Sequence, residues 1–337
     1  MTLKKVLLLV AALIVAAFVL TACAGVAGSE GPAGPAGPAG PAGAAGPAAV
    51  STDLSCTECH NDTSIITGKK ADWSISVHGT GAGLAYAGER KDCAGCHDGA
   101  AFSTMIAEGK NFTQVESTNA SPTHQDCRTC HQIHVTYTGA DWALEIDAPV
   151  TFVTSGLTFD GGKGNLCANC HQARRYMASF VDKTDATKYT TANPRFNSHY
   201  SVQGDILMGS GGFGVEGKPG AHYSMVENTC AACHMGEGQD HTFKPQVSAC
   251  VACHADAESL DVNGAKTKVD ERMAELKAAL TAKGLLDAEG AVIPGTWDEA
   301  TATAIWNYEV IEEDKSNGVH NPVYVNALLD VALEALK

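Results

Sequence analysis

The chain has 337 residues and a formal net charge of -15 at pH 7, with 13 cysteines, 13 histidines and only 6% aromatic residues. A chain this acidic is a poor binder of nucleic acids and anionic surfaces and favours basic partners or cations, unless the acidity mainly keeps the surface soluble. So few aromatic side chains also contribute little to the core of a domain of this length.

The N-terminus predicts export. A basic start and an unbroken apolar run of fifteen residues precede the tetrapeptide Leu20-Thr21-Ala22-Cys23, which resembles a bacterial lipoprotein box and implies a lipid on Cys23 after cleavage. An uncleaved membrane anchor is the alternative, but it needs about 20 apolar residues. We therefore predict a signal peptide at 1–22 and an exported lipoprotein of the outer membrane or cell surface, on its periplasmic or extracellular face.

A spacer is expected next. Residues 31–48 are six Gly-x-y triplets with proline at five of the six x positions. This composition is collagen-like, and a triple helix would imply a trimer. Six triplets are few for a triple helix, so a single polyproline spacer of about 55 Å is the preferred interpretation. We assign 23–50 to the lipid anchor and spacer.

Residues 51–262 carry the pentapeptide Cys-x-x-Cys-His six times. In c-type haem attachment the two thiols bond to the haem and the histidine binds the iron. Zinc ribbons or disulfides would also use paired cysteines, but neither explains a histidine after all six pairs. We predict six covalent haem c groups, with iron, on Cys56, Cys59, Cys93, Cys96, Cys127, Cys130, Cys167, Cys170, Cys230, Cys233, Cys250 and Cys253. The proximal iron ligands are then His60, His97, His131, His171, His234 and His254.

The second axial ligands decide what the irons can do, because an iron ligated on both faces carries electrons and an open one binds small molecules. Seven histidines lie outside the motifs, enough to close six irons with one left over: His78, His124, His134, His199, His222, His241 and His320. His124 and His134 lie too close to the third motif to fold back on it, so they are expected to cap neighbouring haems. Methionines are possible substitutes but are better explained as packing residues.

The motif spacing predicts a fold that is mostly α with extensive irregular loops and little β. Short helices should carry the motifs, and haems rather than side chains should fill the centre of this hexahaem core at 51–262. Residues 263–337 have helical periodicity instead, with helices expected from Val269 to a stop near Gly284, from about Trp297 to Glu312, and after Asn321. This C-terminal segment should supply the distal ligand His320.

Several segments resemble known families. His222, Cys230 to Met235, His241, and Cys250 to His254 resemble the multihaem superfamily of ammonia-forming nitrite reductase and the octahaem cytochromes. Residues 314–324 look like that family's helix-borne distal ligand, and 73–78 resemble a distal-ligand helix. Residues 197–205 and 209–214 are similar to surface cytochromes of metal-reducing bacteria. The nitrite reductases commonly use Cys-x-x-Cys-Lys at the substrate haem, which this chain lacks, and their position resembling His241 can belong to the substrate pocket.

Three functions remain open. The leading hypothesis is electron transfer, more an electron carrier than an enzyme, through six haems between a membrane redox carrier and a periplasmic or extracellular acceptor. The alternatives are a multihaem oxidoreductase that reduces nitrite or a related oxyanion at one open haem, and a cytochrome filament subunit whose surplus histidine caps the next protomer. No catalytic residue is assigned. The expected partners are redox proteins or extracellular acceptors and, through Cys23, the membrane.

Overall fold

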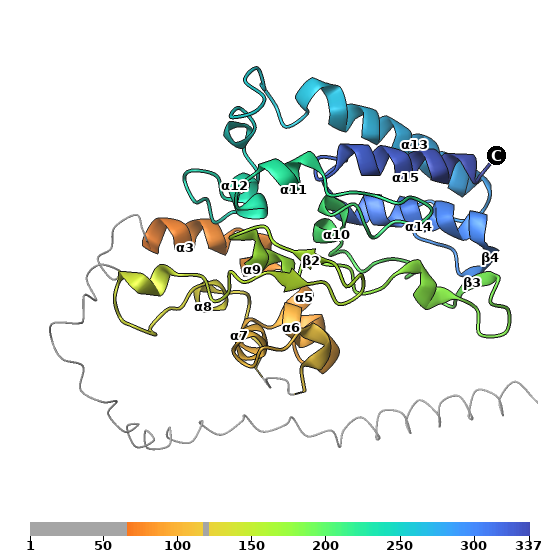
Figure 1. The fold of residues 1–337 in the computed structure, drawn as a ribbon. Helices are drawn as coiled ribbons and strands as arrows, with labels where there is room; N and C mark the ends of the chain where they lie inside the picture. The colour runs from red at the N-terminus through yellow and green to blue at the C-terminus, as the bar shows by residue number, and fades with distance from the viewer. Residues whose placement is uncertain (1–65, 117–120) are drawn as a thin grey trace, which may run out of the picture. The chain divides into compact units, whose positions relative to one another are not determined.

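The computed structural model describes residues 66–116 and 121–337, which belong to one compact unit. The signal peptide, the spacer and the motif Cys56–His60 lie outside the described residues. The described chain is mostly helix and loop with two small antiparallel sheets, which confirms the expected fold class (Figure 1). None of its helices combines the length and apolar character that a bilayer crossing needs.

The motif-bearing part is built from short elements joined by loops. Its helices are α3 (Ile66–Ser74), α4 (Val77–Thr80), α5 (Gly83–Ala87), α6 (Lys91–His97), α7 (Gly99–Ala107), α8 (Cys127–Cys130), α9 (Gly164–Ala168), α10 (Gln203–Leu207), α11 (Ala221–Met225) and α12 (Thr229–His234). One small sheet pairs β1 (Val150–Thr151) with β2 (Thr158–Phe159). Helices of one or two turns are marginal without tertiary support, so this part depends on what packs between them.

Three longer helices form the C-terminal part: α13 (Ala265–Ala282), α14 (Glu299–Asp314) and α15 (Pro322–Glu334). Gly284, at φ 69°, ends α13 in the left-handed conformation that glycine tolerates. Asp298 caps α14, and Asn321 caps α15 by accepting the Tyr324 N–H at 3.2 Å. These helices confirm the sequence prediction, except that Trp297 lies in β4 (Gly295–Asp298), which pairs with β3 (Lys188–Thr191).

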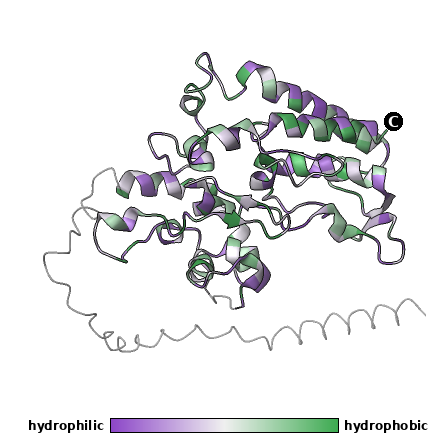
Figure 2. Ribbon diagram, in the orientation of Figure 1, coloured by the Kyte–Doolittle hydropathy of each residue, from purple (hydrophilic) through white to green (hydrophobic). Residues whose placement is uncertain are grey.

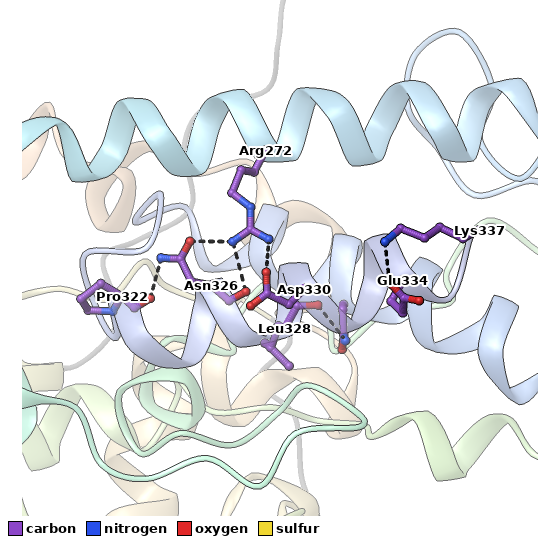
Figure 3. Close-up of polar contacts among 8 residues, drawn as sticks. Arg272, Pro322, Asn326, Leu328, Asp330, Glu334 and Lys337 are labelled. Atoms are coloured by element: carbon purple, nitrogen blue, oxygen red, sulfur yellow. Dashed lines mark hydrogen bonds and ion pairs between the residues drawn. The ribbon is translucent and has the colours of Figure 1, made fainter.

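Polar contacts of one residue, Arg272, join α13 to α15. The Arg272 guanidinium donates to Asn326 Oδ1 at 2.8 Å and forms an ion pair with Asp330 at 2.5 Å (Figure 3). The strongly apolar colouring of α15 shows that its remaining surface is suited to burial (Figure 2). Leu328, Leu329 and Val325 are fully buried in the shared core. This arrangement fixes where α15 begins, and therefore where His320 lies.

The main side-chain core lies at the C-terminal helices and includes residues from the middle of the chain. Trp306 is fully buried and its Nε1–H donates to the Gly211 carbonyl at 2.8 Å. Gly212 lies so close to α15 that an added Cβ would be 2.3 Å from a Leu328 methyl carbon, so a larger residue there would require the buried Leu328 side chain to shift. In contrast, the other apolar clusters, formed by described residues of the motif-bearing part, are small. The main side-chain core therefore belongs to the C-terminal helices, and the haem-filled centre expected for residues 51–262 stays a prediction.

Candidate haem centres

Each described motif forms about one helical turn. The histidine N–H donates to the carbonyl of the first cysteine at 2.9 Å in the motifs of His131 and His171, and at 2.8 Å in that of His254. His97 and His234 are the last residues of α6 and α12. One helical turn brings the first and fifth residues of the pentapeptide to the same face. The local sequence thus gathers two thiols and an imidazole around one position.

Five motif histidines each face a histidine from elsewhere in the chain. The ring centroids of every pair lie 6.2 to 6.4 Å apart. The pairs are His78 with His171, His97 with His199, His131 with His241, His222 with His254, and His234 with His320. Each pair, together with the two cysteines of its motif, is called a site and is named by its motif histidine; the pair of His78 and His171 is thus the His171 site.

The spacing tests whether an iron fits between the rings. An imidazole nitrogen binds a transition metal at about 2 Å and lies roughly 1.2 Å from its ring centre, so two rings on opposite faces of one iron have centroids about 6.4 Å apart. Directly packed aromatic rings span about 4.5 to 7 Å, so what favours an iron is the same narrow spacing recurring in five pairs that each contain one motif histidine. The observed 6.2 to 6.4 Å therefore fits a haem iron between each pair.

The alternative uses of paired cysteines find no geometric support in the described residues. The ten cysteines there form no disulfide. No group of three or more histidine, cysteine or acidic side chains in this part of the chain converges on a point that suits a metal ion. A zinc ribbon needs four such ligands around one centre. The arrangement of two separated imidazoles with a pair of thiols suits haem instead.

Exposed apolar side chains gather beside the histidines. Of the fourteen large apolar residues that are exposed among residues 66–116 and 121–337, nine lie within three positions of a histidine. They are Ile75, Val77, Val135, Tyr137, Tyr200, Met225, Val251, Val319 and Val323. Val77, next to His78, is 82% exposed. Apolar surface gathered in this way marks a binding surface, and a porphyrin face is the apolar group that these positions suit.

Hydrogen bonds fix which nitrogen each imidazole presents. Nδ1 of His131 contacts the Trp142 carbonyl oxygen at 2.8 Å, and Nδ1 of His234 contacts that of Phe243 at 2.8 Å. His241, His222 and His171 likewise direct Nδ1 at an oxygen, of Gln239, Val319 and Gln203 respectively. A carbonyl oxygen only accepts, so Nδ1 carries the proton and Nε2 keeps its lone pair for a metal.

His199 and His320 differ from this pattern. Nε2 of His199 is 3.4 Å from Arg174 Nη1, and burial followed by the charge of Arg174 lowers the pKa of His199 to about 4. His320 directs Nδ1 at the Asp314 carboxylate, 2.6 Å away. Burial alone would lower the pKa of His320, but the Asp314 carboxylate outweighs it and raises the pKa.

The motifs also touch one another. Cys170 Sγ lies 3.9 Å from the Gly95 carbonyl oxygen, and a hydrogen bond between Cys96 and Cys170 lowers the pKa of Cys96. A hydrogen bond between Cys167 and Cys230 likewise lowers the pKa of Cys230, to about 6. The His171 motif is therefore in contact with the motifs of both His97 and His234.

Phe243 joins three sites. Its ring lies 4.7 Å from that of His78 and 5.9 Å from that of His241, while its carbonyl oxygen accepts from His234. It holds a φ of 59°, which is uncommon for a bulky side chain. The His131, His171 and His234 sites are thus neighbours in space.

His134 and His124 are not among the ten histidines of these five pairs. His134 is exposed and stacks on Tyr137, and its backbone N–H donates to Asp141 at 2.8 Å. His124 is half-buried among polar neighbours. Met105 and Met177 are buried in side-chain clusters, which confirms them as packing residues. Asp314 was missed from the sequence, although an acidic residue in the last turn of a helix is electrostatically unfavourable and is a signal of another role.

No family model matches the chain. It is 24% identical over 356 residues to the C-type polyheme cytochrome OmcB of Geobacter sulfurreducens, covering 82% of this chain and 43% of that protein. OmcC of the same organism is 26% identical over 227 residues, covering 49% of this chain and 29% of the relative. The chain thus spans less than half the length of these curated relatives.

A solved structure has a similar fold. The outer cell wall cytochrome OcwA superposes with a TM-score of 0.53 at 20% identity, over 80% of this chain and 50% of that one. The sequence and fold comparisons therefore point to the same class of protein.

Proposed function

From the premise that this chain is a relative of the polyhaem c-type cytochromes, we propose that it transfers electrons through six covalent haems with histidine on both faces. The five histidine pairs carry this proposal, since each joins one motif histidine to one from outside the motifs. A haem ligated in this way supplies one-electron transfer and offers no open iron position to a substrate. The same pairs favour a carrier over a nitrite reductase.

The residues assigned to the haems are those expected from the sequence. The twelve motif cysteines form the thioether bonds, and the motif histidines bind the irons from the proximal side. His78, His199, His222, His241 and His320 bind from the distal side, each opposite its partner. In this assignment His241 is an iron ligand and not part of a substrate pocket.

His134 is our proposed distal ligand for the first motif, whose proximal ligand is His60. The supporting observation is the uncovered apolar surface around His134, where Val135 is 66% exposed and Tyr137 50%. Paired histidines such as His78 and His199 have the same kind of neighbour. His124 lies between Thr123 and Gln125 and has no apolar residue of this kind beside it.

Single alanine variants separate the two histidines. We expect His134→Ala to convert one low-spin haem to high-spin, because alanine leaves the iron with an open face, whereas His124→Ala should leave all haems low-spin. EPR of the oxidised proteins measures both. A high-spin haem in His124→Ala, with none in His134→Ala, would reverse the assignment.

The contacts between motifs define a route for electrons. The His171 motif contacts those of His97 and His234 through its two cysteines. Phe243 brings the His131 site to the same point. His222, which faces His254, contacts the carbonyl oxygen of Val319, the residue before the His234 partner His320, so the His254 site lies next to the His234 site. We propose that the His171 site is the junction of a branched chain and that the His254 site is at one end.

Export and anchoring complete the proposal. The signal at 1–22, lipidation of Cys23 and the spacer to residue 50 would place the haem-bearing residues 51–262 and the helices of 263–337 outside the cytoplasm, at the outer membrane or cell surface. OcwA, which has a similar fold, is an outer cell wall cytochrome, and this supports the proposed location. The partners would be a membrane redox carrier and a periplasmic or extracellular acceptor. His124 is the surplus histidine that would cap a haem of the next protomer if the protein formed a filament.

Oxidation of the reduced protein separates carrier from reductase. A soluble ferric complex should reoxidise all the haems, as followed by their absorbance, since electrons can leave a haem without the oxidant binding to its iron. Nitrite and hydroxylamine should cause no ligand-binding spectral change and no turnover, because both faces of each iron are closed. Steady turnover with nitrite would contradict the carrier and support the multihaem oxidoreductase.

A further inference from the structure

Asp314 is the one carboxylate that contacts an assigned iron ligand through Nδ1 in the described part of the chain. Its Oδ1 lies 2.6 Å from His320 Nδ1, and the Asp314 side chain is fully buried. The other assigned ligands whose Nδ1 contacts are described direct it at neutral carbonyl oxygens. The His234 site therefore differs from its neighbours in the charge behind its distal ligand.

A small network holds this contact in place. Ser316 Oγ donates to Asp314 Oδ2 and accepts from the His320 backbone N–H at 3.2 Å. His320 is positioned by the α15 cap, because Asn321 accepts from Tyr324 and donates to the Lys218 carbonyl at 2.9 Å. These contacts hold both the carboxylate and the imidazole in position.

A buried carboxylate on Nδ1 changes the ligand electronically. It draws the Nδ1 proton toward itself and makes Nε2 a stronger donor, which favours the ferric over the ferrous state. Its negative charge acts in the same direction, and burial leaves it poorly screened. Neutral carbonyl partners have a weaker effect.

We propose that Asp314 is a tuning residue that gives the His234 site the lowest reduction potential of the five described sites. The proposal rests on the haem assignments of the proposed function. The His234 site lies between those of His171 and His254. An electron that passes between these two sites must therefore first be transferred uphill, onto the haem of lowest potential. Asp314 would thus regulate passage to one end of the chain.

Redox titration of Asp314→Asn tests this inference. Asparagine keeps an oxygen acceptor for Nδ1 but removes the charge, so we expect the potential of one haem to shift upward while the others stay in place. The EPR signal of the same haem should lose its imidazolate-like character. Ser316→Ala should shift that potential downward, because Asp314 then loses a competing donor.

Glu312→Gln is the matched control. Glu312 lies in the same last turn of α14, but it is half-exposed and its carboxylate pairs with Lys315 at 2.7 Å. Removing this charge should leave all potentials nearly unchanged. Equal shifts in Asp314→Asn and Glu312→Gln, or no shift in Asp314→Asn, would overturn the tuning role. A high-spin haem in Asp314→Asn would also overturn it, by showing that Asp314 holds His320 on the iron.

Failure of the underlying function would be visible separately. It would appear in the unmodified protein, as fewer than six haems by mass or as a high-spin iron. Failure of the tuning role alone would leave the unmodified protein with six low-spin haems.

Discussion

Alanine at both Cys167 and Cys170 should destabilise the protein far more than alanine at both Cys250 and Cys253. Cys170 lies against Gly95 and Cys96, and Cys167 lies against Cys230. Loss of this haem would therefore leave a cavity where three motifs meet. We expect the free energy of unfolding to fall by at least about 3 kcal/mol, the range found when a large buried group is lost.

The control removes the proposed terminal haem, at a motif where Cys253 is exposed and Val251 is 43% exposed. This variant should fold with five haems and a smaller loss. Guanidinium unfolding followed by circular dichroism compares the two, and mass spectrometry counts the haems. Equal destabilisation by both double variants would contradict a central position for the His171 site.

Replacing His241 with alanine should open one haem. Its ring faces that of His131 at 6.3 Å, and its Nδ1 is held by the Gln239 carbonyl oxygen at 2.7 Å, so alanine removes an oriented ligand. One of the six proposed haems should become high-spin, and the reduced variant should bind carbon monoxide, whereas the unmodified protein should not. EPR and optical titration measure these effects.

Methionine at the same position provides the matched comparison. His241→Met offers a thioether to the iron and should restore low-spin ligation at a higher potential. The result that would contradict the assignment is a fully low-spin His241→Ala protein with unchanged ligand binding. His241 would then be better explained as a pocket or surface residue.

The sequence allowed the local chemistry to be predicted, because it depends on neighbouring residues. One helical turn brings the thiols and imidazole of each motif together, and hydrophobic periodicity located α13, α14 and α15. The number of histidines outside the motifs also showed that enough candidate distal ligands exist for six irons.

The pairing of the histidines was not predictable. The partners lie roughly 30 to 110 residues apart and are joined by loops whose course depends on tertiary contacts. His78, for example, faces His171, and not the nearer motif that ends at His97. The contribution of the loop around Gly212 to the C-terminal core was also missed, because this loop has no periodicity of its own.

The pairs also bear on the nitrite reductase resemblance. The His222-to-His254 segment was expected to supply ligands or a pocket, and the structure places His222 opposite His254 at 6.3 Å. Each of the five described motif histidines has an imidazole across from it. An open haem would therefore have to be the one attached at the first motif, where we assign His134.

Quantitative EPR of the fully oxidised, intact protein tests the central claim most directly. Histidine on both faces of every iron should give six low-spin ferric haems per chain and no high-spin signal. A high-spin signal that integrates to one or more haems per chain would contradict the claim.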